Sequence, residues 1–165
     1  MKIAYLFVGQ GSQKVGMGKE VYDHYGSSKA VFDSAKTDFD LISTTFNGPE
    51  EVLNKTAFTQ VCLLVTSLAI AAALDEEGIK AQGAAGLSLG EYSALTYTKA
   101  LSLDKALPLV RTRGQIMASA LPANTSSMSA VLSDKLDVIL ETLKENNHGV
   151  VEIANYNSPS QFVLS

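Results

Sequence analysis

The sequence lacks the features that mark secreted, nucleic-acid-binding and membrane proteins. Its single cysteine, Cys62, excludes a disulfide within the chain and favours a reducing, cytoplasmic compartment. Lysine and arginine form no runs and the net charge is −4, so we expect no nucleic-acid partner. The most apolar stretch, residues 61–74, contains Thr66 and Ser67 and is too short for a bilayer, so we expect no membrane partner.

The glycine-rich loop at residues 9–18 does not match a nucleotide-binding motif. A dinucleotide fingerprint needs glycine where Lys14 stands, and a phosphate loop needs serine or threonine where Glu20 stands. We therefore predict no cofactor. The loop follows a predicted strand, and open α/β sheets bind their ligands at the carboxyl ends of strands, so Gln10 is available as a donor near a site.

Alternating strand and helix patterns predict an α/β fold. Strands are expected at 3–8, 82–87, 128–132, 150–155 and 161–164. Helices are expected at 17–37, 49–53, 59–77, 89–98, 103–120 and 135–146. The stretch between the first helix and residue 48 is expected to be irregular. Residues 121–127 are rich in turn formers and predict a linker. We expect a three-layer parallel-sheet domain at 1–124 and the start of a smaller α/β insert at 125–165.

Residues 86–90, Gly-Leu-Ser-Leu-Gly, have the pattern of a nucleophile elbow between a strand and a helix. The glycines permit a sharp turn in which a side chain would collide with neighbouring backbone, and the Ser88 hydroxyl then points outward. The amide of Leu89 lies at a helix N-terminus, where it favours a developing oxyanion. The pattern predicts acyl transfer through an acyl-serine, and an ordinary glycine-rich turn is the alternative.

Five motifs together resemble a known family. They are Gly9-Gln10-Gly11-Ser12-Gln13, Thr59-Gln60, residues 86–95 around Ser88, Arg113-Gly114-Gln115-Ile116-Met117 and Asn155-Tyr156-Asn157-Ser158-Pro159. In order and spacing they resemble the bacterial malonyl-CoA:acyl carrier protein transacylases of fatty acid synthesis, and more distantly the acyltransferase domains of polyketide and animal fatty acid synthases. The resemblance spans the whole chain and implies malonyl-CoA and acyl carrier protein as partners.

The resemblance also implies roles for single residues. Ser88 would attack the malonyl thioester, and the backbone amides of Gln10 and Leu89 would hold its carbonyl oxygen. Arg113 would pair with the free malonyl carboxylate through two parallel hydrogen bonds. Without the resemblance, Arg113 reads as a solvated helix residue.

Two further residues, Gln60 and Asn157, match positions that line or support the same pocket. The segment from residue 125 onward resembles the beginning of the family's ferredoxin-like subdomain. Members of the family are about twice as long, so the chain resembles their N-terminal half.

The sequence offers no evident base for Ser88. His24 falls in a predicted surface helix and His148 in a turn, so neither is expected to act in catalysis or to bind a metal ion. The resemblance places the base, a histidine, beyond residue 165, in a C-terminal half that belongs either to a second chain or to a longer form of this chain. We also expect the apolar side chains of Val151, Ile153, Phe162 and Leu164 to lack packing partners.

Three alternatives to a fatty acid transacylase stay open at this point. The chain is an inactive fragment or an interaction module if no base is supplied. A serine hydrolase would use the same turn, although Arg113 does not suit a lipase-like pocket, because a buried cation without an anion is costly. A polyketide-type acyltransferase would use a different acyl group or carrier.

Overall fold

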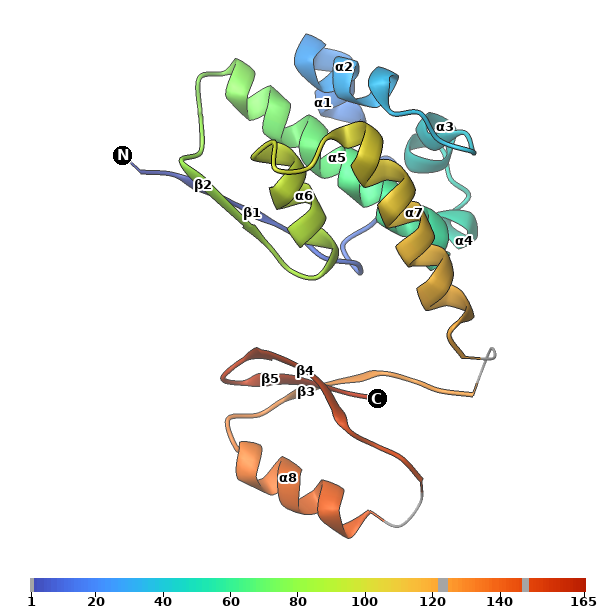
Figure 1. The fold of residues 1–165 in the computed structure, drawn as a ribbon, viewed down its shortest axis with the longest axis vertical. Helices are drawn as coiled ribbons and strands as arrows, with labels where there is room; N and C mark the ends of the chain where they lie inside the picture. The colour runs from blue at the N-terminus through green and yellow to red at the C-terminus, as the bar shows by residue number, and fades with distance from the viewer. Residues whose placement is uncertain (1, 122–124, 147–148) are drawn as a thin grey trace. The chain divides into compact units, whose positions relative to one another are not determined.

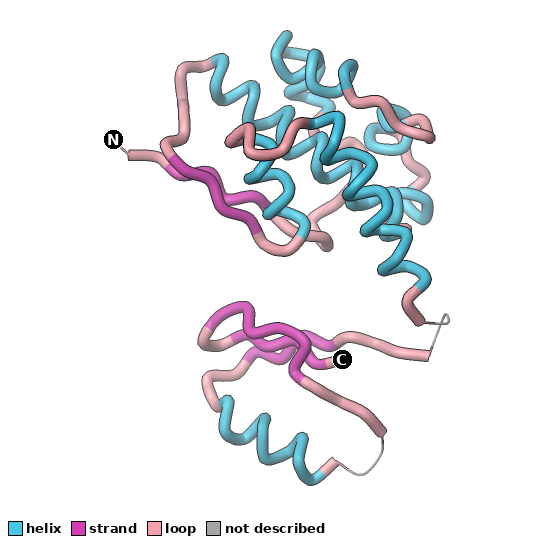
Figure 2. The backbone as a smooth tube through the Cα atoms, viewed as in Figure 1, coloured by secondary structure: helices cyan, strands magenta, loops and turns pink. Residues whose placement is uncertain are grey.

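A computed structural model describes residues 2–121, 125–146 and 149–165, and the chain divides into two compact units, Met1–Ala120 and Leu121–Ser165 (Figure 1). Each unit contains its own strands and at least one helix (Figure 2). The expected boundary between residues 124 and 125 falls at the edge of 122–124, which lie outside the described residues.

The first unit contains a parallel pair of strands, β1 (Ala4–Phe7) and β2 (Gly83–Gly86), aligned so that Phe7 faces Gly86. Parallel strands need a long connection between them, and here several helices supply it. Side chains alternate along β1: Tyr5 and Phe7 pack against the helices, whereas Leu6 is 79% exposed. The expected α/β fold with a parallel sheet is present, but the described strands carry helices on one face only, so they form no third layer.

The helices of the first unit surround one long apolar helix. They are α1 (Lys19–His24), α2 (Gly26–Ser34), α3 (Leu41–Phe46), α4 (Glu50–Leu53), α5 (Thr56–Glu76), α6 (Leu89–Tyr97) and α7 (Leu103–Ser119). Helix α5 lies in their midst and packs against α2, α6 and α7 (Figure 1). Twelve of its 21 residues are buried, so α5 forms the core of the unit.

Helix α5 corrects the expectation about membrane spans. At 21 residues it is long and apolar enough to cross a bilayer by length and composition alone. However, 67% of its most apolar window is buried inside the unit, as in the core helix of a globular protein. Cys62 lies within α5 and is fully buried, as expected of a small core residue, and this burial raises the pKa of its thiol to about 11.

Two predictions before residue 48 are wrong. The helix expected at 17–37 is two helices, because the chain is extended at Tyr25 and α2 folds back on α1. In one helix the rings of Tyr22 and Phe32 would lie about 15 Å apart along the axis, yet their centroids are 5.5 Å apart. The stretch expected to be irregular contains α3, which Asp40 caps by accepting a hydrogen bond of 2.9 Å from the Ser43 amide.

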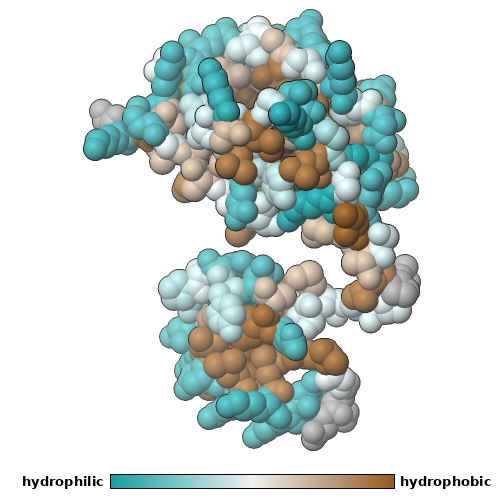
Figure 3. Space-filling view, viewed as in Figure 1, coloured by the Kyte–Doolittle hydropathy of each residue, from teal (hydrophilic) through white to brown (hydrophobic). Residues whose placement is uncertain are grey.

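The second unit is a three-stranded antiparallel sheet with one helix. Its elements are β3 (Ser129–Leu132), α8 (Leu136–Glu145), β4 (Ile153–Ser158) and β5 (Gln161–Leu164), and the sheet order is β3-β5-β4. Phe162, on the central strand, is buried and meets the ring of Tyr156 edge to face, so the expectation that Phe162 lacks partners is wrong. Hydrophobic residues also reach the surface of this unit (Figure 3). Leu132 and Val150 are among its exposed apolar side chains.

Candidate active site

The site begins at the turn from β2 into α6. Strand β2 ends at Gly86, helix α6 begins at Leu89, and Ser88 between them has a φ of 53°. That conformation is uncommon for a residue with a side chain and costs on the order of 1–3 kcal/mol. A Cβ on Gly86 would lie 2.0 Å from the Gly90 carbonyl carbon, and a Cβ on Gly90 would lie 2.2 Å from the Phe7 carbonyl oxygen. Only glycine fits at either position.

We expect Gly90→Ala to lower the free energy of unfolding by about 3 kcal/mol, because the new methyl group meets rigid backbone of β1 that cannot move aside. Urea denaturation measures the change. Gly26→Ala is the matched control: Gly26 is also helical and a Cβ there would meet nothing within 4 Å, so this variant should be as stable as the parent or slightly more stable. Equal stability of the two variants would contradict the close approach at Gly90.

The Ser88 hydroxyl is held by an arginine from α7. The Arg113 Nη2 atom donates to Ser88 Oγ at 2.8 Å, and its Nη1 atom donates to the Gln60 side-chain oxygen at 2.7 Å. The guanidinium also lies 5.5 Å from the ring centre of Tyr92. A cation is therefore placed directly beside the candidate nucleophile.

Gln60 links this arginine to the loop after β1. Its amide group is fully buried, and its Nε2 atom donates to the Gln10 side-chain oxygen at 3.2 Å and contacts the Met117 sulfur at 3.3 Å. The Gln10 Nε2 atom in turn donates to the Thr56 hydroxyl at 3.1 Å. Side chains from α5, α7 and the β1 loop thus form one hydrogen-bonded network that ends at Ser88.

Two backbone amides beside the turn are unused. A Cβ on Gly9 would lie 2.9 Å from the Leu87 carbonyl oxygen, so the loop that carries Gln10 runs against the turn that carries Ser88. In the part of the chain that the structure describes, neither the Gln10 nor the Leu89 backbone N–H donates a hydrogen bond. Both amides are available to an oxyanion.

The remaining predicted residues are Asn157 and the two histidines. Asn157 is exposed on β4 of the second unit, where its Nδ2 atom donates to the Gln161 side-chain oxygen at 3.1 Å. His24 is exposed, as expected, and His148 lies outside the described residues. Among the residues that the structure describes, no imidazole or carboxylate hydrogen-bonds to Ser88, and no cluster of metal-ligating side chains occurs.

Sequence reasoning missed two contributors, Thr56 and Tyr92, and assigned no role to Met117. Each stands four residues from a predicted site residue on the same helix or at its start: Thr56 from Gln60, Tyr92 from Ser88, and Met117 from Arg113. Residues four apart share a helix face. The four-residue spacing from a predicted site residue could therefore have indicated that these three residues lie beside the site.

The comparison with known families agrees with this geometry. The model of the family described as "Acyl transferase domain" matches residues 4–165. The chain belongs to the acyl transferase domain family. A malonyl CoA-acyl carrier protein transacylase of Bacillus subtilis (strain 168) is 42% identical over 169 residues, which cover 99% of this chain and 53% of that protein.

Two solved structures give the same picture for this chain. The malonyl CoA-acyl carrier protein transacylase of Clostridium perfringens is 43% identical, with a TM-score of 0.89 over 99% of this chain and 53% of the other. A malonyl-transacylase solved in complex with its type II PKS acyl-carrier protein is 36% identical, with a TM-score of 0.90 over 99% of this chain and 54% of the other. The chain spans about half the length of the relatives it matches.

Proposed function

We propose that the chain acts in the transfer of a malonyl group from malonyl-CoA to acyl carrier protein, through an acyl-Ser88 intermediate. The observation that carries the proposal is the hydrogen bond of 2.8 Å between Arg113 Nη2 and Ser88 Oγ. It puts a planar cation directly beside the oxygen atom to which a short acyl group would be attached. The names of the relatives support the same reaction.

Two successive displacements at carbon make up this reaction. Ser88 Oγ attacks the thioester carbonyl, the C–S bond breaks, and the serine proton leaves with the CoA thiol by way of a base. The thiol of the carrier then attacks the acyl-serine ester and releases Ser88. The family resemblance assigns the base to a histidine beyond residue 165, which the complete protein or a second chain would supply.

We propose the turn at Ser88 as a nucleophile elbow whose oxyanion is held by the amides of Gln10 and Leu89. Each donor would stabilise the transition state by about 3 kcal/mol, because among the described residues neither amide donates to another acceptor. The conformation of Ser88, with φ at 53°, supports this assignment, because a strained turn of this kind presents the hydroxyl outward.

Arg113 would select the acyl group. A guanidinium has five N–H donors, and the Ser88 hydroxyl and Gln60 occupy one each, so the others are available to a carboxylate. The buried Gln60 side chain would hold the Arg113 guanidinium in place. Asn157 remains a proposed pocket residue on the family resemblance alone.

We propose the first unit as the N-terminal part of a large acyltransferase domain and the second unit as the beginning of a ferredoxin-like subdomain. The β-α-β-β order of the second unit and its central β5 strand are consistent with the first part of a β-α-β-β-α-β fold. No cofactor enters the proposed chemistry, and the cytoplasm is the proposed location.

The test is covalent labelling. The protein is mixed with malonyl-CoA, and intact-mass measurement with peptide mapping follows any adduct on Ser88. The proposal expects a stable malonyl adduct that acyl carrier protein removes. Release of free malonate without a carrier would instead identify a hydrolase, and the absence of any adduct would identify an inactive chain or an interaction module.

A further inference from the structure

The chain has eleven lysines and only two arginines, Arg111 and Arg113, which stand two residues apart on α7. The proposed function uses Arg113 and leaves Arg111 without a role. Both side chains reach the N-terminal part of α5: Arg111 contacts the Ala57 carbonyl group and Arg113 contacts Gln60. The two arginines therefore hold α7 against α5 at neighbouring points.

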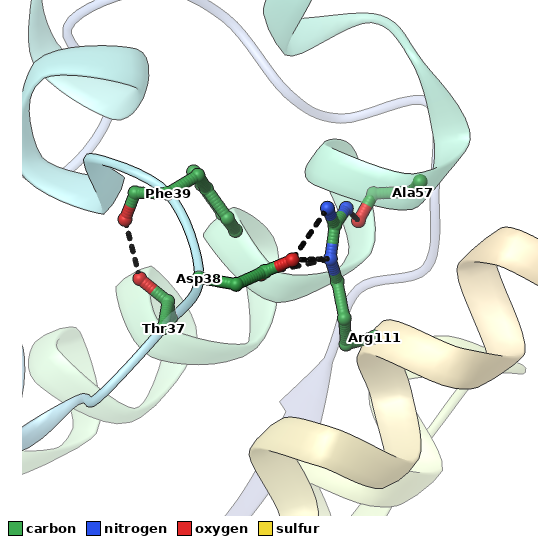
Figure 4. A network of polar contacts seen from close by, with 5 residues as sticks. All are labelled: Thr37, Asp38, Phe39, Ala57 and Arg111. Atoms are coloured by element: carbon green, nitrogen blue, oxygen red, sulfur yellow. Dashed lines mark hydrogen bonds and ion pairs between the residues drawn. The ribbon is translucent and has the colours of Figure 1, made fainter.

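Arg111 has its own set of hydrogen-bonding partners, separate from those of Arg113 (Figure 4). Its Nη1 atom donates to the Ala57 carbonyl oxygen at 2.8 Å, and its Nη2 and Nε atoms both donate to the Asp38 Oδ2 atom, at 3.0 and 3.3 Å. The Nε atom also lies 3.0 Å from the Asp38 Oδ1 atom. Two N–H groups of one planar guanidinium therefore engage one carboxylate, which the single ammonium of a lysine does not reproduce. Asp38 belongs to the segment between α2 and α3, so the contact ties three parts of the first unit together.

Two aromatic rings complete this site. The Arg111 guanidinium lies 4.6 Å from the ring centre of Phe58 and 5.2 Å from that of Phe39, and the two rings meet edge to face. The Arg111 side chain is only 18% exposed, so its charge interactions are less screened than those of a surface pair. The guanidinium also holds the pKa of the Asp38 carboxyl below its usual value. We call Asp38, Phe39, Ala57, Phe58 and Arg111 the Arg111 clamp.

The clamp acts where α7 packs closely on α5. A Cβ on Gly114 would lie 2.9 Å from both the Ala57 Cα atom and the Thr56 carbonyl oxygen. Gly114 allows this approach, but a glycine cannot prevent α7 from rotating or sliding on α5. The directional hydrogen bonds of Arg111 can, because they fix both the height and the rotation of α7 at Ala57.

We propose that Arg111 is a positioning residue for acyl-group selectivity. This proposal rests on the proposed function. Through the clamp, Arg111 orients α7 so that the guanidinium of Arg113, two residues further on, is directed toward Ser88. The Arg113 side chain is long, so a small rotation of α7 about its axis displaces the guanidinium more than it displaces the backbone. A displacement of about 1 Å at a reacting group can cost about 100-fold in rate.

The first readout is selectivity, measured on the full chain with malonyl-CoA and acetyl-CoA as acyl donors. We expect Arg111→Met to slow Ser88 acylation by malonyl-CoA about 30-fold or more and acylation by acetyl-CoA less than about threefold, because only the malonyl group uses the orientation of Arg113. Arg111→Lys should not restore selectivity, since an ammonium lacks the fork. Lys105→Met, which removes a cation from the exposed side of α7, is the matched control and should keep the parent's ratio.

The second readout needs no activity. With two arginines in the chain, a ¹⁵N spectrum of arginine side chains contains two Nε–H signals, and Arg111→Met leaves only that of Arg113. We expect ¹⁵N relaxation to report a rigid Arg113 in the parent protein and a mobile one in the variant. Asp38→Asn covers the case in which Arg111→Met does not fold, because the Asp38 side chain is 61% exposed and asparagine has nearly the same size and shape.

The two readouts separate the clamp from the proposed function. If the parent protein is not acylated at all, the chain does not carry out the proposed function by itself, and the Arg113 relaxation still decides the clamp. A rigid Arg113 in the clamp variants, or one already mobile in the parent, would overturn the proposal. Equal losses of malonyl and acetyl transfer would show that Arg111 serves stability alone.

Discussion

Ser88→Ala is expected to abolish covalent acylation by malonyl-CoA. The hydroxyl is the group that would bond to the acyl carbon, and it stands alone at the turn beside the unused amides of Gln10 and Leu89. Because no other described serine or cysteine is hydrogen-bonded to Arg113, no second nucleophile can take its place. The measurement is intact mass after incubation with malonyl-CoA, in the complete or reconstituted protein that labels best.

Ser34→Ala is the control for this prediction. Ser34 is an exposed serine at the end of α2, so its loss tests whether removing a hydroxyl elsewhere affects labelling. The control should label at the rate of the parent protein. Unchanged labelling of the Ser88 variant would remove the basis of the nucleophile assignment, whatever the family of the chain.

Arg113→Ala is expected to reduce malonyl transfer by about 100-fold or more, because the malonyl carboxylate loses two charge-assisted hydrogen bonds. Acetyl transfer should persist, since an acetyl group has no charge to pair. The comparison of acylation rates with malonyl-CoA and acetyl-CoA measures the effect. Arg113→Lys should also be impaired with malonyl-CoA, because an ammonium cannot reproduce the planar fork.

The Arg113 variants also bear on stability, which must be measured beside activity. Removing Arg113 leaves the side-chain oxygen of the buried Gln60 without this donor, at a cost of about 1–3 kcal/mol. Gln60→Leu in the Arg113→Ala background removes the orphaned group and should recover part of the loss. An equal fall in malonyl and acetyl transfer, in a variant that unfolds like the parent, would make Arg113 a structural residue.

The turn at Ser88 and the elements beside it could be predicted because their causes are local. Backbone crowding at Gly86 and Gly90 involves atoms of the turn and of one neighbouring strand, and it excludes any side chain whatever the rest of the fold does. The helix at 89–98 and the strand at 82–87 were found to within a residue or two for the same reason. The order and spacing of the motifs, read together, also sufficed to indicate the family.

Contacts between distant segments could not be predicted in this way. The division of the helix expected at 17–37 depends on the packing of Phe32 against Tyr22 and Phe46, which local propensity does not contain. The same holds for Arg111, which reads as a solvated helix residue until Asp38, Phe39 and Phe58 are seen around it.

The sequence by itself determined the turn that exposes Ser88, the α/β alternation and the family, because these depend on local sterics, periodicity and motif order. Only the tertiary structure decided that Arg113 reaches Ser88, that Gln60 joins it to Gln10, and that α5 is a core helix although its length and composition would suit a membrane. Hydrogen bonds and burial of this kind arise between residues tens of positions apart, and their partners are set by how helices pack rather than by their neighbours in the chain.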